Sequence, residues 1–262
     1  MLQEDKIELD PEDRLELDRL RALEAALDPA TQECLLSTGL AKGWRCLEVG
    51  AGAGSVLSWM TSIVGPAGST TAIDLDTRFL GNTSPGTDII HGDIRTHVMQ
   101  AESFHLVHAR YVLVHLPDYE VALARMLETV RPGGWLVVEE PHSSAARAIS
   151  GGKEDMASVE KMNRAIRRIF MNAGKDYDLG IRFPSLFQAA RLRNIRVEYD
   201  APASQGTSAI ADMMRICAAQ AKQRYIDTGE ATEQDVDNYC RFAQDPNSWA
   251  IYYATVRVMG QK

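Results

Sequence analysis

The chain has 262 residues, of which 45% are hydrophobic and 24% are charged, the balance of an ordinary globular protein with a well-filled core. Its formal net charge of -8 repels polyanions, which argues against a nucleic-acid partner. No run approaches the roughly 18 uninterrupted apolar residues of a membrane helix, and the start, MLQEDKIELD, lacks the regions of a signal peptide. We therefore expect a cytoplasmic protein with no membrane partner.

The cysteines suggest no special chemistry. They lie far apart in the chain and form no CxxC or Cys/His ligand pair (Cys34, Cys46, Cys217 and Cys240). The sequence therefore predicts neither a disulfide framework nor a metal site.

The first 28 residues are acidic, with ten acidic and four basic side chains. Leucines recur there at near-helical spacing (Leu17, Leu20, Leu23 and Leu27). This pattern predicts an amphipathic helix from Pro11 to Leu27 that stops at Asp28-Pro29, because the residue before a proline disfavours the helical conformation. Residues 1–31 would form an N-terminal helical lid over a ligand, or a solvated helix that packs on the domain.

From Trp44 onward, short apolar runs alternate with helical stretches. Strands are predicted at 44–49, 70–73, 88–91, 106–109 and 135–139, with helices at 55–64 and 119–130. Alternation of this kind predicts parallel strands joined by right-handed helical crossovers, and hence a doubly wound α/β sheet. We assign residues 32–140 to this core.

After residue 140 the alternation of short strands and helices ends. Residues 141–194 are predicted to be mainly helical, with a loop at 174–180, and to form a cap over a substrate pocket at the sheet edge. Cap residues could wall an apolar pocket or simply pack helices together (Met156, Met162, Phe170, Met171, Tyr177 and Phe183). Residues 195–262 would complete the sheet, with strands at 195–199 and 250–259 and helices at 208–227 and 233–244.

An acidic residue and three alternating glycines follow the first predicted strand, in the order Glu48, Gly50, Gly52 and Gly54. Glycines there let the backbone turn sharply and let a ligand approach to contact distance. A dinucleotide fingerprint needs a glycine where Ser55 stands, and no lysine follows for a phosphate loop. Because Glu48 would repel a pyrophosphate, its carboxylate favours a ligand with a positively charged amine. A purely structural glycine turn is the alternative.

Acidic residues also follow the second and third predicted strands. Asp74 at the end of the second strand can accept hydrogen bonds from both hydroxyls of a ribose. Asp93 after the third can accept one from an adenine amino group, while Leu75 or Ile94 covers the ring. A turn formed by Gly92 and Asp93 is the alternative at that position.

Together these segments resemble class I S-adenosylmethionine-dependent methyltransferases, closely over about residues 32 to 140. Residues 104–110 correspond to a fourth strand, and Arg131-Pro132-Gly133-Gly134 precedes a fifth. Three shorter stretches resemble the bacterial small-molecule, ubiquinone-biosynthesis-like group: LDRL at 17–20, AIDLDTRFL at 72–80 and HLPD at 115–118. The resemblance implies a Rossmann-like methyltransferase fold, with a doubly wound, mostly parallel sheet of seven strands and a helical cap.

The resemblance also implies S-adenosyl-L-methionine as cofactor. The residues that it assigns to the cofactor site are Glu48, Gly50, Ala51, Gly52, Gly54, Asp74, Leu75, Asp93, Ile94, Ala109 and Arg110. Glu48 and the glycine loop would hold the methionine part, and Asp74 the ribose. Asp93 and Ile94 would hold the adenine, while Ala109 and Arg110 would line the methionine side through their backbone. The chain departs from the family at His105, where an aspartate of structural role is usual.

A methyl group on a sulfonium already has a good leaving group, so catalysis of its transfer is largely positioning. An acceptor hydroxyl or acidic carbon gains from a nearby base, and histidine suits that role near neutral pH. His115 and His142 follow the fourth and fifth predicted strands and are our catalytic candidates, with a structural role in the following turn as the alternative for His115. The other histidines are interpreted as strand or surface residues (His91, His97, His105 and His108).

We predict an enzyme that transfers a methyl group to a hydroxyl, carbon or amine of a small organic molecule, such as a secondary metabolite or quinone-like compound. The alternative is a protein of the same fold that binds S-adenosylmethionine and catalyses a non-methylating reaction such as cyclisation. A nicotinamide-dependent oxidoreductase is a third interpretation, against which Ser55 argues. A homodimer is left open as the assembly.

Overall fold

The computed structural model describes residues 10–81 and 86–262; residues 1–9 of the acidic segment lie outside the described residues. The helices are α1 (Pro11–Ser37), α2 (Ser55–Val64), α3 (Tyr119–Thr129), α4 (Lys153–Asn172), α5 (Phe183–Ala189), α6 (Ala209–Gln220), α7 (Lys222–Ile226) and α8 (Glu233–Gln244). The strands are β1 (Arg45–Val49), β2 (Ser69–Asp74), β3 (Thr87–His91), β4 (Phe104–Arg110), β5 (Val130–His142), β6 (Arg147–Ser150), β7 (Arg193–Asp200), β8 (Ser204–Gln205), β9 (Trp249–Ile251) and β10 (Ala254–Gln261). Short 3-10 turns include η2 (Leu113–His115) and η4 (Leu179–Arg182).

Seven strands form the central sheet, in the order β3-β2-β1-β4-β5-β10-β7. The first five pair in parallel, and β10 runs antiparallel between β5 and β7. This topology confirms the predicted doubly wound, mostly parallel sheet. Because the chain order reverses beside β1, the carboxyl ends of β1, β2 and β4 meet at the switch point where such sheets bind ligands.

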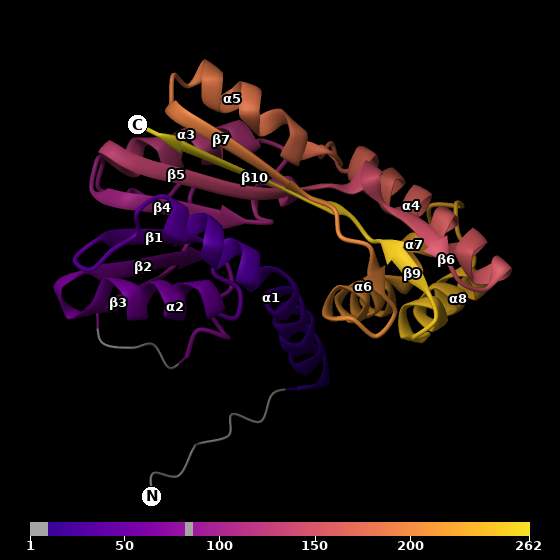
Figure 1. Cartoon of the computed structure of the whole chain (residues 1–262). Helices are drawn as coiled ribbons and strands as arrows, with labels where there is room; N and C mark the ends of the chain where they lie inside the picture. Colours follow the sequence, from indigo (N-terminus) through magenta and orange to yellow (C-terminus); the bar gives the residue numbers. More distant parts are fainter. Residues whose placement is uncertain (1–9, 82–85) are drawn as a thin grey trace, which may run out of the picture.

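Helices cover both faces of this sheet (Figure 1). α1 and α2 pack on one face, where Cys34, Leu35, Val56 and Met60 join the buried side of the strands. α3, α5 and η4 pack on the other face around a larger apolar core. The sheet is therefore buried on both sides, as its near-continuous apolar strands require.

A second core lies beyond the carboxyl edge of the sheet, at the right of Figure 1. α4 packs against α8 and α7, with α6 beside α8, and the antiparallel sheet β6-β9-β8 lies beside them. Its buried residues come from two stretches of chain, one before β7 and one after it. α1 contacts α6, so this helical cap and the sheet are joined along the N-terminal helix.

The predicted end of the first helix is wrong, because α1 continues through Pro29 to Ser37. A proline inside a helix removes one backbone hydrogen bond and costs about 3 kcal/mol. The helix continues because residues beyond the proline are buried at helical spacing against the sheet (Leu27, Thr31, Cys34 and Leu35). Tertiary packing thus outweighs the local signal of Asp28-Pro29.

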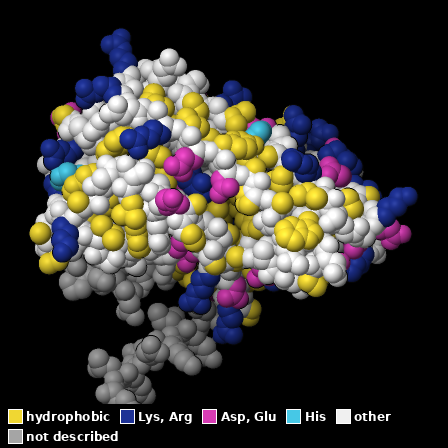
Figure 2. Space-filling view, viewed as in Figure 1, with side chains coloured by type: hydrophobic (Ala, Val, Ile, Leu, Met, Phe, Trp, Pro, Cys, Tyr) yellow, Lys and Arg dark blue, Asp and Glu magenta, His cyan; other side chains and the backbone are white. Residues whose placement is uncertain are grey.

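The surface of the molecule carries mixed charges (Figure 2). Acidic, basic and apolar side chains alternate over the face shown, with basic side chains gathered over the region of α4. None of the helices in residues 10–81 and 86–262 is long and apolar enough to cross a membrane.

Candidate functional site

The glycine-rich loop connects β1 to α2 and bends because of its glycines. Gly50 has a φ of +72°, and a Cβ there would lie 2.2 Å from Val112 Cγ2. Gly54 caps the start of α2 with a φ of +90°. α1 covers the loop, since a Cβ on Gly52 would meet Leu20 Cδ2 at 3.3 Å. The loop is thus held between the turn after β4 and the N-terminal helix.

Asp74 ends β2 directly beside this loop. Its carboxylate accepts hydrogen bonds from the Gly52 N–H at 3.0 Å and the Asp76 N–H at 2.9 Å. The neighbouring Leu75 side chain is 60% exposed, which is unusual for a large apolar residue at a sheet edge. Ala51 packs partly buried against the apolar cluster behind the loop.

Asp93 follows β3 and is held by its own turn. It pairs with Arg95, which also reaches Asp118 at 2.6 Å before α3. The guanidinium hydrogen bonds from Arg95 lower the pKa of Asp93, so this carboxylate is ionised near neutral pH. Ile94 beside it is buried against the core.

Ala109 and Arg110 end β4 next to the loop. Ala109 is fully buried and pairs with Val49 of β1. The Arg110 guanidinium turns toward α1 and donates to Thr31 Oγ1 and to Asp28 Oδ1, each at 2.9 Å. Asp28 in turn accepts from Ser55 Oγ at 3.1 Å, so α1 is tied to the start of α2.

His108 is a site residue that sequence reasoning missed. It lies in strand β4, which agrees with its interpretation as a strand or surface residue, but its ring is fully buried between two carboxylates. Nδ1 lies 2.8 Å from Glu48 Oε2, and Nε2 lies 2.9 Å from Glu139 Oε1. Glu139 also accepts from Arg257 Nε at 2.8 Å and Thr31 Oγ1 at 3.1 Å. Glu48, the acidic residue predicted beside the glycine loop, therefore lies at one end of a buried network of charged side chains.

The charges in this network support one another. Burial alone would lower the pKa of His108, but the two carboxylates raise it to about 9. Burial likewise opposes ionisation of Glu139, yet His108, Arg110 and Arg257 bring its pKa below the usual value. The cluster thus contains an imidazolium between two carboxylates. Among the described residues, no group of three or more His, Cys, Asp or Glu side chains is arranged to hold a metal ion.

Glu140 holds the turn after β4 in place. Its carboxyl group accepts from the backbone N–H groups of Val112, Leu113 and Val114 at 2.7 to 3.2 Å. Burial raises its pKa to about 8, because backbone donors lower it less than the lost hydration raises it. The turn that Glu140 holds is the one that carries His115.

The structure places the two candidate histidines in different surroundings. His115 ends η2, and its side chain is exposed to solvent while the neighbouring protein desolvates it in part. This partial desolvation, with the positive charges of Lys175 and Arg19, lowers its pKa to about 4, so the ring is neutral near pH 7. His142 ends β5, where Nδ1 lies 2.9 Å from the Tyr199 hydroxyl and Nε2 lies 3.9 Å from Asp178.

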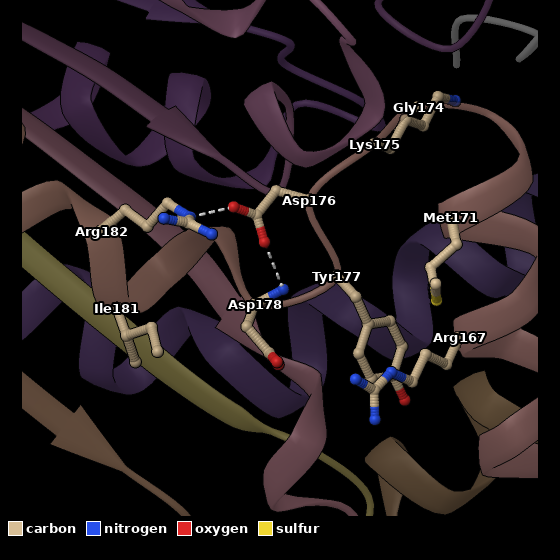
Figure 3. Close-up of a pocket in the computed structure, with 9 residues that line it drawn as sticks. All are labelled: Arg167, Met171, Gly174, Lys175, Asp176, Tyr177, Asp178, Ile181 and Arg182. Atoms are coloured by element: carbon tan, nitrogen blue, oxygen red, sulfur yellow. Dashed lines mark hydrogen bonds and ion pairs between the residues drawn. The ribbon is translucent and has the colours of Figure 1, made fainter.

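A cavity of about 600 Å³ lies between the end of α4 and η4 (Figure 3). Its lining residues are Arg167, Met171, Gly174, Lys175, Asp176, Tyr177, Asp178, Ile181 and Arg182. Arg182 pairs with Asp176 across the face of the cavity shown. Of the predicted cap residues, Met171 and Tyr177 thus line a cavity, whereas Met162 and Phe183 are buried in the two cores.

A second cavity, of about 680 Å³, lies between α1 and the α6–α8 side of the cap. Leu15, Asp18 and Arg21 line it from α1, and Asp212 and Arg215 from α6. The N-terminal helix therefore faces the glycine loop along one part of its length and an open space along another.

The structure brings Glu48, the glycine loop, Asp74 and the end of β4 together at the carboxyl edge of neighbouring strands. Asp93 and Ile94 follow the adjacent strand β3. The partners that the sequence did not indicate are Thr31, His108, Glu139 and Arg257. His108, Glu139 and Arg257 become neighbours of Glu48 or of one another through strand pairing, and Thr31 joins them through the packing of α1. Single positions in the chain do not reveal such contacts.

A protein-family model matches most of this chain. The model described as methyltransferase domain matches residues 17–200, a span that includes α1, the glycine loop and the central strands through β7.

Individual relatives agree with this match. The chain is similar to methyltransferase str2 of Strobilurus tenacellus, with 24% identity over 260 residues that cover 94% of each chain. It is also similar to demethylmenaquinone methyltransferase of Staphylococcus aureus, with 32% identity over 108 residues. That second match covers 39% of this chain and 45% of the relative, so it spans less than half of either protein.

Solved structures share the fold. The YcgJ protein of Bacillus subtilis superposes with a TM-score of 0.57 at 16% identity, covering 88% of this chain and 97% of that one. Phosphoethanolamine N-methyltransferase 2 of Haemonchus contortus, solved with S-adenosyl-L-methionine, superposes with a TM-score of 0.51 at 15% identity, covering 85% of this chain and 49% of that one.

Proposed function

Because this chain belongs to the methyltransferase domain family and uses S-adenosylmethionine as its methyl donor, we propose that it methylates a hydroxyl, carbon or amine of a small organic molecule. A secondary metabolite or a quinone-like compound is the acceptor class that we favour. The similarity to a demethylmenaquinone methyltransferase over 108 residues supports a quinone-like acceptor.

One observation carries the proposed cofactor site. Glu48 is a buried carboxylate beside the glycine loop, and within the described chain it receives a hydrogen bond from His108 alone. A carboxylate has about four acceptor directions, so a buried one with a single donor is suited to a ligand that brings further donors. The amino group of the methionine part of the cofactor has that chemistry. The residues present therefore fit the cofactor.

The other residues complete this proposed site. Asp74 would accept from the ribose hydroxyls while its contact with the Gly52 N–H keeps it aligned with the loop. The exposed Leu75 side chain and the buried Ile94 would contact the adenine, and Asp93 would accept from its amino group. Burial of Leu75 by the adenine ring would remove the apolar surface that it now exposes.

The bound cofactor supplies a methyl group on a sulfonium, which reacts when a nucleophile is held in line at about 3 Å. The chain must therefore position the acceptor, exclude water and, for a phenol or enol, take a proton. His115 is our candidate for the last task, because desolvation, together with the charges of Lys175 and Arg19, keeps its ring neutral and so free to accept a proton. Lys175 also lines the 600 Å³ cavity, which makes that cavity our proposed acceptor site. His142 remains a candidate with Tyr199 and Asp178 as its partners.

The proposed function is tested by binding and turnover together. Calorimetric titration should show binding of S-adenosylmethionine and S-adenosylhomocysteine but not of NAD. Incubation with labelled S-adenosylmethionine and a panel of naphthoquinols, catechols and primary amines should then release S-adenosylhomocysteine with at least one acceptor. Binding of NAD without binding of S-adenosylmethionine would overturn the proposal, and a new product without S-adenosylhomocysteine would favour the non-methylating alternative.

A further inference from the structure

Three buried glutamate carboxyl groups lie near the sheet edge, and they accept different numbers of hydrogen bonds. Glu139 accepts three hydrogen bonds, from His108, Thr31 and Arg257. Glu140 accepts three from backbone N–H groups. Glu48 shares the single Nδ1–H of His108 between its two oxygens, at 3.0 and 2.8 Å, within the described residues. Of the three, Glu48 therefore has the most acceptor capacity left for a ligand.

His108 is fixed from both sides by these carboxylates. Because carboxylates only accept hydrogen bonds, both ring nitrogens of His108 must donate, Nδ1 to Glu48 and Nε2 to Glu139. The ring is fully buried, and its donors are aimed along one line from β1 through β4 to β5. It therefore cannot turn without leaving a buried carboxylate without a partner, which is costly.

The far end of this line is anchored on two other elements. Arg257 of β10 and Thr31 of α1 both donate to Glu139 Oε2, and Thr31 also accepts from Arg110. The position of the Glu48 carboxylate therefore depends, through His108 and Glu139, on the placement of α1 and β10. This is the arrangement in which surrounding hydrogen bonds orient a ligand-binding group.

We propose that His108 is a positioning residue for cofactor binding, which holds the Glu48 carboxylate at the glycine loop so that its free acceptor directions meet the amino group of the cofactor. This inference rests on the proposed function, in which Glu48 binds that amino group. His108 does not touch the cofactor; it acts through Glu48. The ligand chemistry that the network selects is a primary ammonium group attached to a nucleoside.

The test compares two probes that differ in the amino-acid part of the molecule, which carries this group. S-adenosylhomocysteine carries the amino group, whereas 5′-methylthioadenosine has the same nucleoside and sulfur without the amino acid. In His108→Gln, calorimetry should show S-adenosylhomocysteine binding weakened by about tenfold or more, with the Kd of methylthioadenosine within about threefold of the wild type. Glu48→Gln should show the same selective loss, and combining the two substitutions should add little.

Two further variants keep the inference testable if His108→Gln fails to fold. Thr31→Val and Glu139→Gln leave His108 in place but weaken its anchor, so each should cause a smaller loss with the same selectivity. His105→Gln is the matched control, because His105 lies on the same strand and, among the residues that the structure describes, bonds only to Arg45 and Arg131 near the surface. Both Kd values should stay unchanged in this control.

The outcomes separate this inference from the proposed function. Equal weakening of both probes in the folded His108, Glu139 and Thr31 variants would show a merely structural role, and no weakening would show no role; either result overturns the inference. Failure of the wild-type chain to bind S-adenosylhomocysteine would instead overturn the proposed cofactor site itself.

Discussion

Glu139 and Glu140 are neighbours in β5 that point to opposite faces of the sheet, and their surroundings move their pKa values in opposite directions. Both lose hydration on burial, which raises the pKa of each. Cationic partners, His108 and Arg257 among them, reverse this effect for Glu139, whereas backbone N–H groups do not reverse it for Glu140. Near pH 7, Glu139 is therefore ionised, while Glu140 largely keeps its proton. A full positive charge within hydrogen-bond distance decides which carboxylate is charged.

Asp74→Ala should weaken cofactor binding. The substitution removes the proposed acceptor for the ribose hydroxyls and also the contact that aligns Gly52. Leaving charge-assisted bonds unmade costs about 1.5 to 3 kcal/mol, so calorimetry should show an affinity lower by a factor of about 10 to 150. Asp76→Ala is the matched control, because Asp76 pairs with the exposed Arg78 instead. Unchanged affinity in Asp74→Ala would remove this residue from the site.

The pH dependence of turnover tests His115 as the base. Because its pKa is lowered to about 4, the acid limb of kcat/KM should fall with an apparent pKa well below 6.5. His115→Gln should lower kcat by about 10² to 10⁴-fold, leave cofactor affinity intact and abolish that limb. The same measurements on His142→Gln distinguish the two histidines. If both variants keep kcat within a few-fold, the reaction proceeds by positioning alone or with an acceptor that is already deprotonated.

The sequence predicts single candidate site residues where their position at the end of a predicted strand is informative. Glu48, the glycine loop and Asp74 lie at strand ends, and the structure brings them together because parallel strands end at one edge. His108 could not be recognised, because its partners Glu48 and Glu139 lie 60 and 31 residues away in the chain. The geometry that makes it a site residue arises only when β1, β4 and β5 pair.

At the scale of elements, the sequence predicts the bounds of a helix correctly where the residues that favour its start and end agree with its packing in the fold. The bounds of α2 and α8 match the predicted ranges, and α8 begins with a capping box formed by Thr232 and Asp235. α1 was predicted too short, because burial of its second half overrides Pro29. β6 was not predicted, because it has four residues and alternates exposed with half-buried positions.

Removal of the first half of α1 should affect turnover more than stability. Deleting residues 1–24 removes Leu20 and Glu24, which contact the glycine loop and the start of α2, but keeps the buried second half of the helix. We expect turnover to fall at least about tenfold, because elements that cover a site exclude water and complete it. Thermal unfolding should show a change in Tm of only a few degrees. Full turnover in the truncated chain would assign this half of α1 to packing.

For the whole molecule, the buried network predicts that stability falls as the pH rises. His108 has a folded-state pKa of about 9 against an ordinary value of 6.5, so its contribution is complete below pH 6.5 and is lost as the pH rises through 9. Glu140, raised from 4.5 to about 8, acts in the same direction over a lower range. Together they should remove on the order of a few kcal/mol of stability between pH 6.5 and 9.

Thermal unfolding at several pH values measures this effect. The Tm should decline steadily from pH 6.5 to 9, and His108→Gln should decline less over the same range. His115 acts in the opposite direction: because its pKa is lowered from 6.5 to about 4, its contribution to stability is complete above pH 6.5 and is lost as the pH falls toward 4, so it offsets that of Glu140 between pH 4.5 and 6.5. A Tm that rises between pH 7 and 9 would contradict a charged His108 in the folded protein.

The cap draws its core from α4 on one side of β7 and from α6, α7 and α8 on the other. Contacts between such distant parts of the chain have a high contact order, so the cap should consolidate late in folding, after β7 has paired with β10. The same topology limits protein engineering. A cap with a different acceptor preference therefore cannot be transferred from a relative as one continuous segment. The segment before β7 and the segment after it must be exchanged together, while β7 of the recipient protein is kept between them.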